Sequence, residues 1–392
     1  MSESLQHFAP KVLSIFKYLH EHPEVSWKEF ETTHYLAELL RNEGLSPKLF
    51  HNCTGLFVDV GVGEPKVGIR ADIDALWQEV DGVERANHSC GHDGHMAMAM
   101  GAIIQLKQQL TEGAVRVIFQ PAEEKGKGAL KMIEMGVIDS LEYLFGVHVR
   151  PSQELQDDEY SPALYHGAAK AFVGEIVGEE AHAARPHLGQ NAIEVGAAIV
   201  EALMHIHHDP MVPASYKLTR FHAGSDSTNI IPGKAEFAID VRAQRNDVMD
   251  HIEEQILHHI AVVARLHGVK IHMKETTSIV AAEVSDEAKS LLQQAIIQTV
   301  GKSKLRPEIH TPGGEDFHYY SVYRPKLKAT MLGLGCGLTP GLHHPNMKFN
   351  EKRLIEGAKI LAEAARLAVK RVYAEGASKY VGIGDFERTN YD

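Results

Sequence analysis

The feature that most constrains the fold is an alternation of short apolar runs with longer amphipathic segments, interrupted once along the chain. Val67–Ala71, Val115–Gln120 and Tyr143–Val149 are short and apolar, as expected of buried strands. Between the first two, His92–Gln109 carries apolar side chains at helical spacing. This alternation predicts an α/β domain with a mostly parallel mixed sheet flanked by helices. Ligands in such folds lie beyond the carboxyl ends of the strands.

A different pattern interrupts the alternation between Ala168 and Thr277. Strand and helix patterns follow there in the order β-α-β-β-α-β, which resembles the ferredoxin-like motif. The expected strands are Ala171–Val177, Tyr216–His222, Lys234–Arg242 and Val269–Thr276, and the expected helices are Asn191–Ile206 and Val248–His267. The chain is therefore expected to form one α/β domain from residues 1–168 and 278–392, with a ferredoxin-like α+β domain inserted at residues 169–277.

The two ends of the chain carry weaker signals. Pro10 is suited to the first turn of a helix expected at Lys11–His20, and a second helix is expected near Lys28–Asn42. At the other end, Glu375–Asp392 is polar and contains glycine, so this tail is expected to be loosely held.

Composition narrows the class of protein. Hydrophobic residues make up 44% of the chain and charged residues 23%, which is typical of globular proteins. The formal net charge of −12 argues against nucleic acid as a partner, because phosphates need clustered Lys and Arg. No stretch is long and apolar enough to span a bilayer, so no membrane partner is expected. Cys53, Cys90 and Cys336 are an odd number at unrelated spacings, which favours a reducing, cytoplasmic location over a disulfide framework.

The stretch Cys90-Gly91-His92-Asp93-Gly94-His95 combines a thiol, two imidazoles and a carboxylate within six residues. A thiolate and an imidazole two positions apart can bind one metal ion, and Gly91 between them lets the backbone bend closely around it. The alternative is a small buried thiol beside solvated histidines. A motif this short does not decide between the two by itself.

Other polar residues follow the expected strands at the edge where a ligand would bind. They are Asp72, Asp74, Glu123, Glu124 and His148 at the ends of strand-like runs, and His343 after a glycine-rich stretch. Taken singly, a pair of glutamates is usually a solvated loop, and a lone histidine is usually structural. Together with the thiolate, the set suits zinc, manganese, cobalt or nickel better than calcium or magnesium.

Several short motifs follow one another along the chain, namely Leu19–Glu24, Arg70–Leu76, Cys90–His95, Phe119–Glu124, Gly146–His148, Ala181–His187, Asn229–Gly233, Gly314–Phe317 and His343–Pro345. In these motifs the chain resembles the dinuclear-metal aminoacylase/carboxypeptidase amidohydrolases, in the branch of the hippurate hydrolases and indole-acetyl-amino-acid hydrolases. The resemblance extends approximately from Val12 to Ala374.

The resemblance implies two divalent metal ions per subunit, with manganese or zinc expected and cobalt or nickel as alternatives. The implied ligands are Cys90, His92, Glu124, His148 and His343. Cys90 would bridge both ions as a thiolate, and His343 is chosen over His344 because the family pattern is His-x-Pro. Asp72 matches no ligand in this branch and is expected to orient an imidazole. Asp93 and His95 are expected to have supporting roles.

The resemblance also implies roles in catalysis and in substrate binding. Glu123 would be the general base, and His182 would stabilise the oxyanion, often across a dimer interface. Without the resemblance, His182 reads as a loop histidine near a turn. Asn229 and Arg242 would bind the free carboxylate of the substrate, Arg being suited to bind it through two hydrogen bonds. Gly314 would bring a backbone N–H close to the same carboxylate.

One stretch departs from the family pattern. Trp77 stands where the family usually has proline, and the link from Trp77 to Cys90 is shorter than usual. Because the Trp77–Ser89 loop is expected near the mouth of the pocket, the size of substrate that the site accepts is left open.

The sequence therefore predicts a cytoplasmic amidohydrolase that cleaves the amide bond of N-acyl-L-amino acids. The inserted domain is expected to act as a lid and to form a homodimer, since His182 lies far in sequence from the site. A dipeptidase or aminopeptidase of the same fold is the alternative, and it would require a free substrate amino group. A non-catalytic protein that binds acyl amino acids is a third possibility. A redox-sensing role for Cys90 is disfavoured, because bound metals would shield a bridging thiolate.

Overall fold

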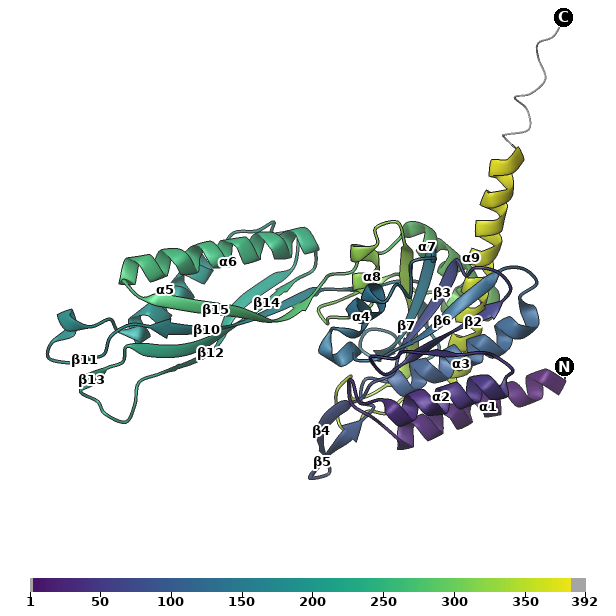
Figure 1. The fold of residues 1–392 in the computed structure, drawn as a ribbon, viewed down its shortest axis with the longest axis horizontal. Coiled ribbons are helices and arrows are strands. Elements are labelled where there is room, and N and C mark those ends of the chain that lie inside the picture. Colours follow the sequence, from purple (N-terminus) through teal and green to yellow (C-terminus); the bar gives the residue numbers. More distant parts are fainter. Residues whose placement is uncertain (1–2, 382–392) are drawn as a thin grey trace, which may run out of the picture. The chain divides into compact units, whose positions relative to one another are not determined.

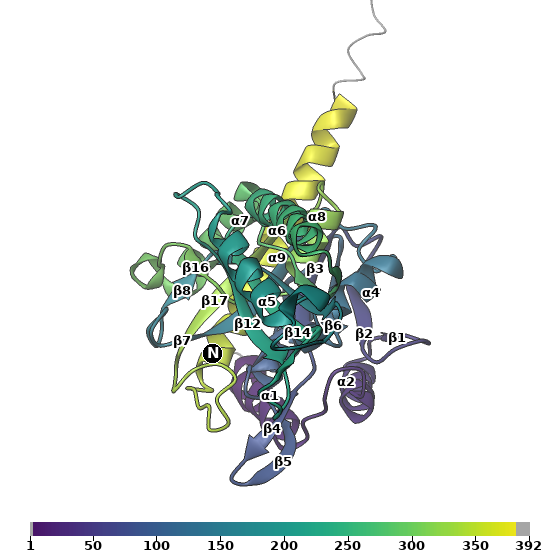
Figure 2. The ribbon, with the colours of Figure 1, turned by 90° about the vertical axis from the view of Figure 1, so that its left-hand side faces the viewer.

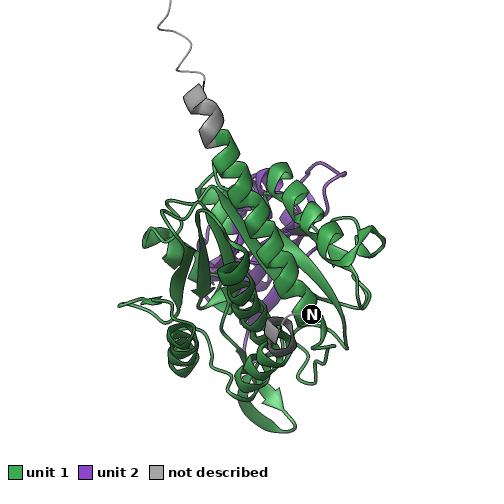
Figure 3. Ribbon diagram, turned by 90° about the vertical axis from the view of Figure 1, so that its right-hand side faces the viewer, with its two compact units in different colours: residues 1–164, 283–309, 319–392 green, residues 165–282, 310–318 purple. Residues whose placement is uncertain are grey.

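The chain divides into two compact units in the computed structural model, which describes residues 3–381 (Figure 3). Unit 1 comprises the residues up to Leu164, Glu283–Ile309 and the residues from Tyr319 onward. Unit 2 comprises Tyr165–Ala282 and His310–His318. Unit 2 thus covers the 169–277 segment and also includes a stretch that the sequence placed in the last part of the α/β domain. Whether unit 2 acts as a lid or forms a dimer stays a prediction.

Unit 1 contains a seven-stranded mixed sheet in the order β1-β2-β6-β3-β7-β17-β8 (Figure 1). Its strands are β1 (Lys48–Leu49), β2 (Leu56–Gly61), β6 (Ala114–Gln120), β3 (Val67–Asp72), β7 (Tyr143–Pro151), β17 (Lys328–Leu338) and β8 (Tyr160–Ser161). The four central strands pair in parallel, whereas β1, β2 and β8 pair antiparallel. The central strands are apolar along their length because helices cover parallel sheets on both faces. The predicted mostly parallel mixed sheet is confirmed.

Helices α1 (Glu3–Glu21) and α9 (Arg353–Val381) pack against α3 (His92–Gln109) in the core of unit 1. The other helices of this unit are α2 (Phe30–Asn42), α4 (Gly128–Glu134), α7 (Asp286–Val300) and α8 (His318–Tyr323), whose first residue belongs to unit 2. The run from Met96 to Ile103 in α3 is buried all round, as expected of a helix without a polar face. A Cβ at Gly101 would lie 2.7 Å from the Cβ of Ala358 and 3.0 Å from Val12 Cγ2. Glycine therefore lets α1, α3 and α9 approach closely.

Unit 2 has its own core, formed by two helices on one face of an antiparallel sheet (Figures 1 and 2). Its elements are β10 (Ala168–Val177), α5 (Ala192–Met204), β12 (Ala214–Ala223), β14 (Lys234–Ala243), α6 (Asn246–His267) and β15 (Lys270–Ile279), and the sheet order is β12-β14-β10-β15. This is the β-α-β-β-α-β order expected from the sequence. Ile252, Ile256 and Ile260 recur every four residues on α6 and form its buried stripe. The alternate residues of β14, including Phe237 and Ile239, are buried beneath the helices.

Short elements complete the fold, and the sequence did not predict them. They are the hairpin β4 (Leu76–Val80) and β5 (Val83–Asn87), the pairs β9 (Leu164–His166) with β16 (Ile309–Thr311) and β11 (Ala181–His182) with β13 (Ile230–Ile231), and the 3-10 turns η1 (Glu123–Lys125), η2 (Pro186–Leu188) and η3 (Lys302–Lys304). The hairpin turns at Asp81 and Gly82, which both have positive φ. Asp-Gly is the expected pair for such a two-residue turn, so the signal was present in the sequence.

Of the two end predictions, the placement of Pro10 in a first helical turn was wrong. Helix α1 begins at Glu3, so Pro10 lies inside it rather than in its first turn. Burial of Phe8 one turn before Val12 extends the packed face, which offsets the loss of one backbone hydrogen bond. Helix α9 extends to Val381 and so includes the first residues of the expected tail, and whether that tail is loosely held stays a prediction. Residues 382–392 of the expected loose tail lie outside the described residues.

None of the helices in residues 3–381 combines the length and the apolarity that a membrane-spanning helix needs.

Candidate metal centre

The expected metal ligands all lie in unit 1, at the edge of the sheet where the central parallel strands end. His92 is the first residue of α3 and Cys90 lies two residues before it. Glu124 lies in the turn after β6, His148 lies in β7, and His343 lies in the loop after β17. Ligand sites of α/β folds form at this edge. The fold thus brings together five side chains that are spread over more than 250 residues of sequence, His343 being 253 residues from Cys90.

The ligand atoms form two overlapping groups that share Cys90. One group contains Cys90, His92 and His148, and the other contains Cys90, Glu124 and His343, with the atoms of each group within 4.8 Å of one another. The Sγ atom of Cys90 lies 3.6 Å from His148 Nε2 and 3.3 Å from His343 Nε2. Glu124 Oε1 lies 3.5 Å from His343 Nε2. The Sγ atom of Cys90 is thus common to both groups.

Two of the imidazoles are oriented by backbone carbonyls. His92 Nδ1 donates to the carbonyl of Asp74 at 2.8 Å, and His148 Nδ1 donates to the carbonyl of Val149 at 2.7 Å. In both rings Nε2 is then the nitrogen that faces the cluster. Metal-binding histidines usually donate their other ring N–H in this way, which fixes the tautomer. The approach to Val149 also requires glycine at position 91, because a Cβ there would lie 2.5 Å from Val149 Cγ2.

The donor atoms fit divalent cations. His92 Nε2 and Glu124 Oε1 are buried and have no hydrogen-bond partner among the described residues. Burial raises the pKa of Glu124 to about 7, and burial together with the nearby Glu124 carboxylate raises the pKa of the Cys90 thiol well above its usual range. Burying such anions is unfavourable unless a cation is present. One thiolate, several imidazoles and a carboxylate together suit borderline transition metals.

Burial is not uniform across the cluster. The side chains of His92 and Glu124 are 0% and 9% exposed, whereas that of His343 is 55% exposed. His343 also has a positive φ of 63°. Its backbone is fixed on two sides, since its N–H donates to Ser89 O at 2.7 Å and its carbonyl accepts from Gln78 Nε2 at 3.0 Å. The centre therefore opens to solvent on the side of His343.

The remaining charged residues of the motifs have other partners. Asp72 accepts hydrogen bonds from His95 Nδ1 and from Arg70 Nη1, both at 2.6 Å. Although burial opposes its ionisation, nearby imidazoles and the Arg70 guanidinium hold the pKa of Asp72 well below its usual range. Asp93 accepts from His20 Nδ1 at 2.6 Å. Asp72 thus orients the imidazole of His95, which is outside the expected ligand set.

The two glutamates that follow β6 are held by Asp74, to which the family resemblance assigns no role. The N–H groups of Glu123 and Glu124 donate to the two oxygens of Asp74, at 3.1 and 3.0 Å. Ser26 donates to the same carboxylate at 2.6 Å. Glu124 shares one candidate group with Cys90 and His343 and another with His92 and Glu123. Glu123 Oε2 and Glu124 Oε1 each lie 3.9 Å from His92 Nε2. Asp74 was visible as the second acid of Asp72-Ile73-Asp74, but its backbone contacts depend on the tertiary fold.

The other expected site residues lie in unit 2 and do not form one group there. His182 and Asn229 are neighbours, because β11 pairs with β13 and the carbonyl of Asn229 accepts from Ala183 N at 2.9 Å. Arg242 lies on β14, where its guanidinium makes two hydrogen bonds of 3.0 Å to Asp240. Gly314 is exposed in the stretch His310–His318. The structure thus leaves the substrate and oxyanion roles of these four residues as predictions.

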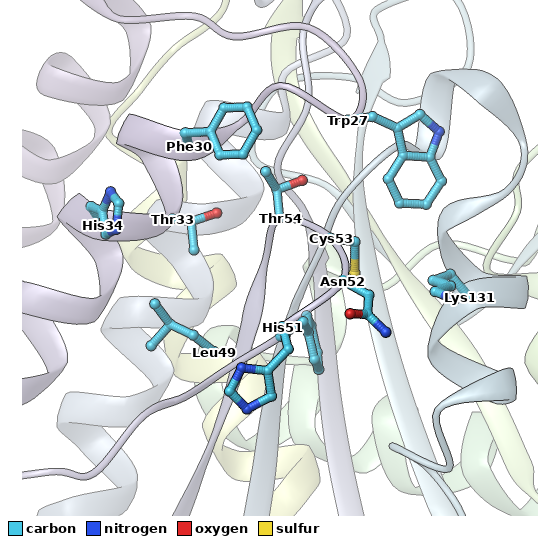
Figure 4. Close-up of a pocket in the computed structure, with 11 residues that line it drawn as sticks. Trp27, Phe30, Thr33, His34, Leu49, His51, Asn52, Cys53, Thr54 and Lys131 are labelled. Carbon is cyan, nitrogen blue, oxygen red and sulfur yellow. The ribbon is translucent and has the colours of Figure 1, made fainter.

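A separate pocket of about 640 Å³ lies in unit 1 (Figure 4). Its lining residues are Trp27, Phe30, Thr33, His34, Leu49, Phe50, His51, Asn52, Cys53, Thr54 and Lys131. None of them belongs to the expected site. Trp27 has a φ of 66°, which is unusual for a bulky side chain.

Comparisons with known proteins agree with the motifs. The model of the family described as Peptidase family M20/M25/M40 matches residues 68–367. An N-acetyl-L-cysteine deacetylase of Bacillus subtilis (strain 168) is 30% identical over 372 residues, covering 91% of this chain and 88% of that protein. The IAA-amino acid hydrolase ILR1-like 5 of Arabidopsis thaliana is 27% identical, covering 90% and 86%. A solved Bacillus subtilis structure, described as a dinuclear metal binding peptidase from the M20 family, has a TM-score of 0.79 and 26% identity, covering 93% of this chain and 99% of that one.

Proposed function

The chain belongs to the peptidase M20/M25/M40 family and is a metal-dependent hydrolase, and from this premise we propose that it hydrolyses N-acyl-L-amino acids to a carboxylate and a free amino acid. Family membership confirms the resemblance found in the motifs. The observation that carries the proposal is the pair of ligand groups that share Cys90, with the carboxylate of Glu123 beside them. The names of the deacetylase and of the amino acid hydrolase support an acyl amino acid as substrate.

Cys90, His92, Glu124, His148 and His343 would hold the two divalent ions of the family, with manganese or zinc proposed and cobalt or nickel as alternatives. The chemistry supplied by such ions is polarisation of the amide carbonyl and acidification of a water molecule. Cys90 would contribute to both ions, since its Sγ atom is common to the two groups.

Glu123 is the proposed general base. Its side chain is 10% exposed, and its backbone is fixed by Asp74 beside the proposed ligand Glu124. Glu123 Oε2 lies 3.9 Å from His92 Nε2, beside the proposed ligands, and from there it would accept a proton from water and deliver it to the leaving amine. Adjacent carboxylates on one turn thereby serve two roles.

Unit 2 would supply the substrate contacts. We assign oxyanion stabilisation to His182, and binding of the substrate carboxylate to Asn229, Arg242 and the N–H of Gly314. A homodimer through unit 2 would allow His182 to act on the partner's site. Three apolar side chains along one side of α5 support such an interface, since Ile193, Val200 and Met204 are 50%, 44% and 73% exposed. The free thiols of Cys53, Cys90 and Cys336 support a reducing, cytoplasmic location.

Peptide hydrolysis is the alternative, favoured by the relative described as a peptidase. The two activities differ in the group beside the cleaved bond, because a dipeptidase or an aminopeptidase requires a free α-amino group. N-acetyl and N-benzoyl amino acids lack that group.

A matched substrate panel tests the proposal. The protein is stripped of metal, reconstituted separately with Mn²⁺, Zn²⁺, Co²⁺ or Ni²⁺, and assayed with N-acetyl amino acids, N-benzoyl amino acids and dipeptides of the same C-terminal residue. The proposal predicts that N-acyl compounds are turned over without a free amino group. Turnover of dipeptides alone would replace it with the peptidase function, and binding of N-acyl compounds without turnover would replace it with a non-catalytic function.

A further inference from the structure

Glu29 is a buried carboxyl group that the proposed mechanism does not use, and we propose that it positions the catalytic loop Ala122–Glu124. The inference rests on the proposed role of Glu123 as general base. Glu29 would touch neither substrate nor metal, and it would act through the backbone that carries Glu123. It is therefore a positioning residue.

The contacts of Glu29 reach directly into this loop. Glu29 is 0% exposed, and its Oε1 atom accepts a hydrogen bond from Ala122 N at 2.9 Å. Its Oε2 atom accepts from the hydroxyl of Thr54. Ala122 is 93 residues away along the chain, so this contact joins the start of α2 to the end of β6.

The side chain is diverted to the loop from a position where it would otherwise cap a helix. Glu29 is the N-cap residue of α2 but makes no capping hydrogen bond with its side chain. Glu24 performs that function instead, accepting from Glu31 N at 3.2 Å and from Thr32 N at 2.8 Å. The carboxyl group of Glu29 instead accepts the hydrogen bond from Ala122 N.

Three successive backbone N–H groups of the loop are held by buried carboxyl groups. Glu29 accepts from residue 122, and Asp74 accepts from residues 123 and 124. Ala122 has a φ of 54° and a ψ of 41°, a left-handed conformation that is unfavourable for a side chain with a Cβ. Such a conformation persists only where the surroundings hold it. Without an acceptor at position 29, the Ala122 N–H would be buried and unpaired, and the turn that aims Glu123 would relax.

Two threonines fix Glu29 in turn. Thr33 Oγ1 donates to the carbonyl of Glu29 at 2.5 Å and accepts from Gly55 N at 2.8 Å, while Thr54 holds the carboxyl group itself. Both threonines line the 640 Å³ pocket (Figure 4). Glu29 therefore contacts a pocket wall on one side and the catalytic loop on the other.

The role requires an acceptor rather than a charge. Burial raises the pKa of Glu29 to about 7, so the protonated and ionised forms are both accessible, and each leaves an oxygen for Ala122 N. A glutamine side chain offers the same acceptor, and the Thr54 hydroxyl can rotate to accept from its amide group. Methionine has similar bulk but no acceptor of comparable strength.

The test compares Glu29→Gln with Glu29→Met in the metal-reconstituted protein, using an N-acyl amino acid that the wild type turns over. Glu29→Met is expected to lower kcat at least about tenfold with KM and metal content near wild type, because misplacing a catalytic group costs rate rather than binding. Glu29→Gln is expected to stay within about threefold of wild type. Cys53→Ser, a neighbour in the pocket wall outside this hydrogen-bond chain, is the control and should leave kcat unchanged.

Amide hydrogen exchange gives a second readout that needs no turnover. In metal-free protein, exchange at Ala122–Glu124 should be faster in Glu29→Met than in wild type and unchanged in Glu29→Gln. If Glu29→Met does not fold, Thr54→Val replaces it, with an expected loss of about threefold in kcat that Thr54→Ser restores.

The inference is overturned if Glu29→Met shows wild-type kcat and wild-type exchange. It is also overturned if Glu29→Gln and Glu29→Met lose the same fraction of kcat. If Glu29→Met is insoluble, an unchanged kcat in Thr54→Val overturns it. Glu123→Gln separates this failure from that of the proposed function. Turnover retained in Glu123→Gln removes the proposed base, whatever Glu29 does. Turnover lost in Glu123→Gln but kept in the Glu29 variants overturns the positioning role alone.

Discussion

The candidate residues of unit 1 and unit 2 differ in how firmly their surroundings hold them. In unit 1, His92, Glu124 and His148 are largely or fully buried, and their orientation is set by Asp74 and by backbone carbonyls. In unit 2, His182 and Asn229 are exposed on a two-stranded ladder, and Arg242 is half-exposed beside Asp240.

The difference in burial suits the residues of unit 1 to metal binding and those of unit 2 to contacts with substrate. A metal centre needs donors at fixed positions, and burial with orienting hydrogen bonds supplies that in unit 1. Exposed groups cost little to rearrange, so the residues of unit 2 suit contacts made only when substrate is present. The comparison predicts that changes in unit 1 alter metal content or the proton transfer, whereas changes in unit 2 leave metal content intact and alter substrate turnover.

The largest effect is expected in unit 1 from Glu123→Gln. Turnover should fall about 10²- to 10⁴-fold, the range for removal of a general base, while two metal ions per chain are retained. Metal analysis and kcat on the same sample check this. Glu112→Gln, at an exposed position after α3, should behave as wild type. Equal kcat in Glu123→Gln and wild type would remove Glu123 from the mechanism.

In unit 2, His182→Ala is expected to lower kcat about 10²- to 10³-fold at unchanged metal content, as for loss of an oxyanion partner. His205→Ala, at an exposed position of unit 2 outside these motifs, serves as the control. Metal loss in His182→Ala would break the separation between the units, because His182 would then support the centre itself.

Arg242→Ala should act mainly on substrate binding. Loss of a charge-assisted pair to the substrate carboxylate is expected to raise KM about 10- to 100-fold, with metal content unchanged. Asp240→Asn is the informative companion, since it frees the guanidinium of Arg242 from its present partner. An unchanged KM in Arg242→Ala would assign the substrate carboxylate to another group.

The smallest effect, a change in metal affinity, is expected near His343, the most exposed of the proposed ligands in unit 1. Gln78→Ala removes the donor to the His343 carbonyl and should weaken metal affinity about two- to fivefold, less than loss of a direct partner of a ligand side chain. Metal competition with a chelator measures this, and Glu84→Ala on the same hairpin is the control. An affinity equal to wild type would show that the hairpin does not hold the His343 loop.

The sequence predicted the features that local patterns determine. The central strands and α3 follow from apolar runs and periodicity, and the ligand candidates follow from their positions at strand ends. The family motifs then indicate Cys90 among 3 cysteines, and His92 and His343 among 25 histidines. Spacing alone could not have made that selection.

What the sequence did not predict depends on contacts between distant segments. Glu29 and Asp74 hold backbone N–H groups that are 93 and 49 residues away, and no local pattern marks a carboxylate whose partner is a distant amide. The association of His310–His318 with unit 2 is also tertiary. The hairpin at Asp81-Gly82 is different, because the Asp-Gly pair is a local signal for a two-residue turn.

We propose that one thiolate, that of Cys90, binds both metal ions. Anomalous diffraction from crystals of the reconstituted protein locates the ions, with Cys90→Ser measured in parallel. Two anomalous peaks are expected, both in bonding contact with Cys90 Sγ, and at least one of them should be lost in Cys90→Ser. A single peak, or two peaks that do not share Cys90, would rule out a bridging thiolate.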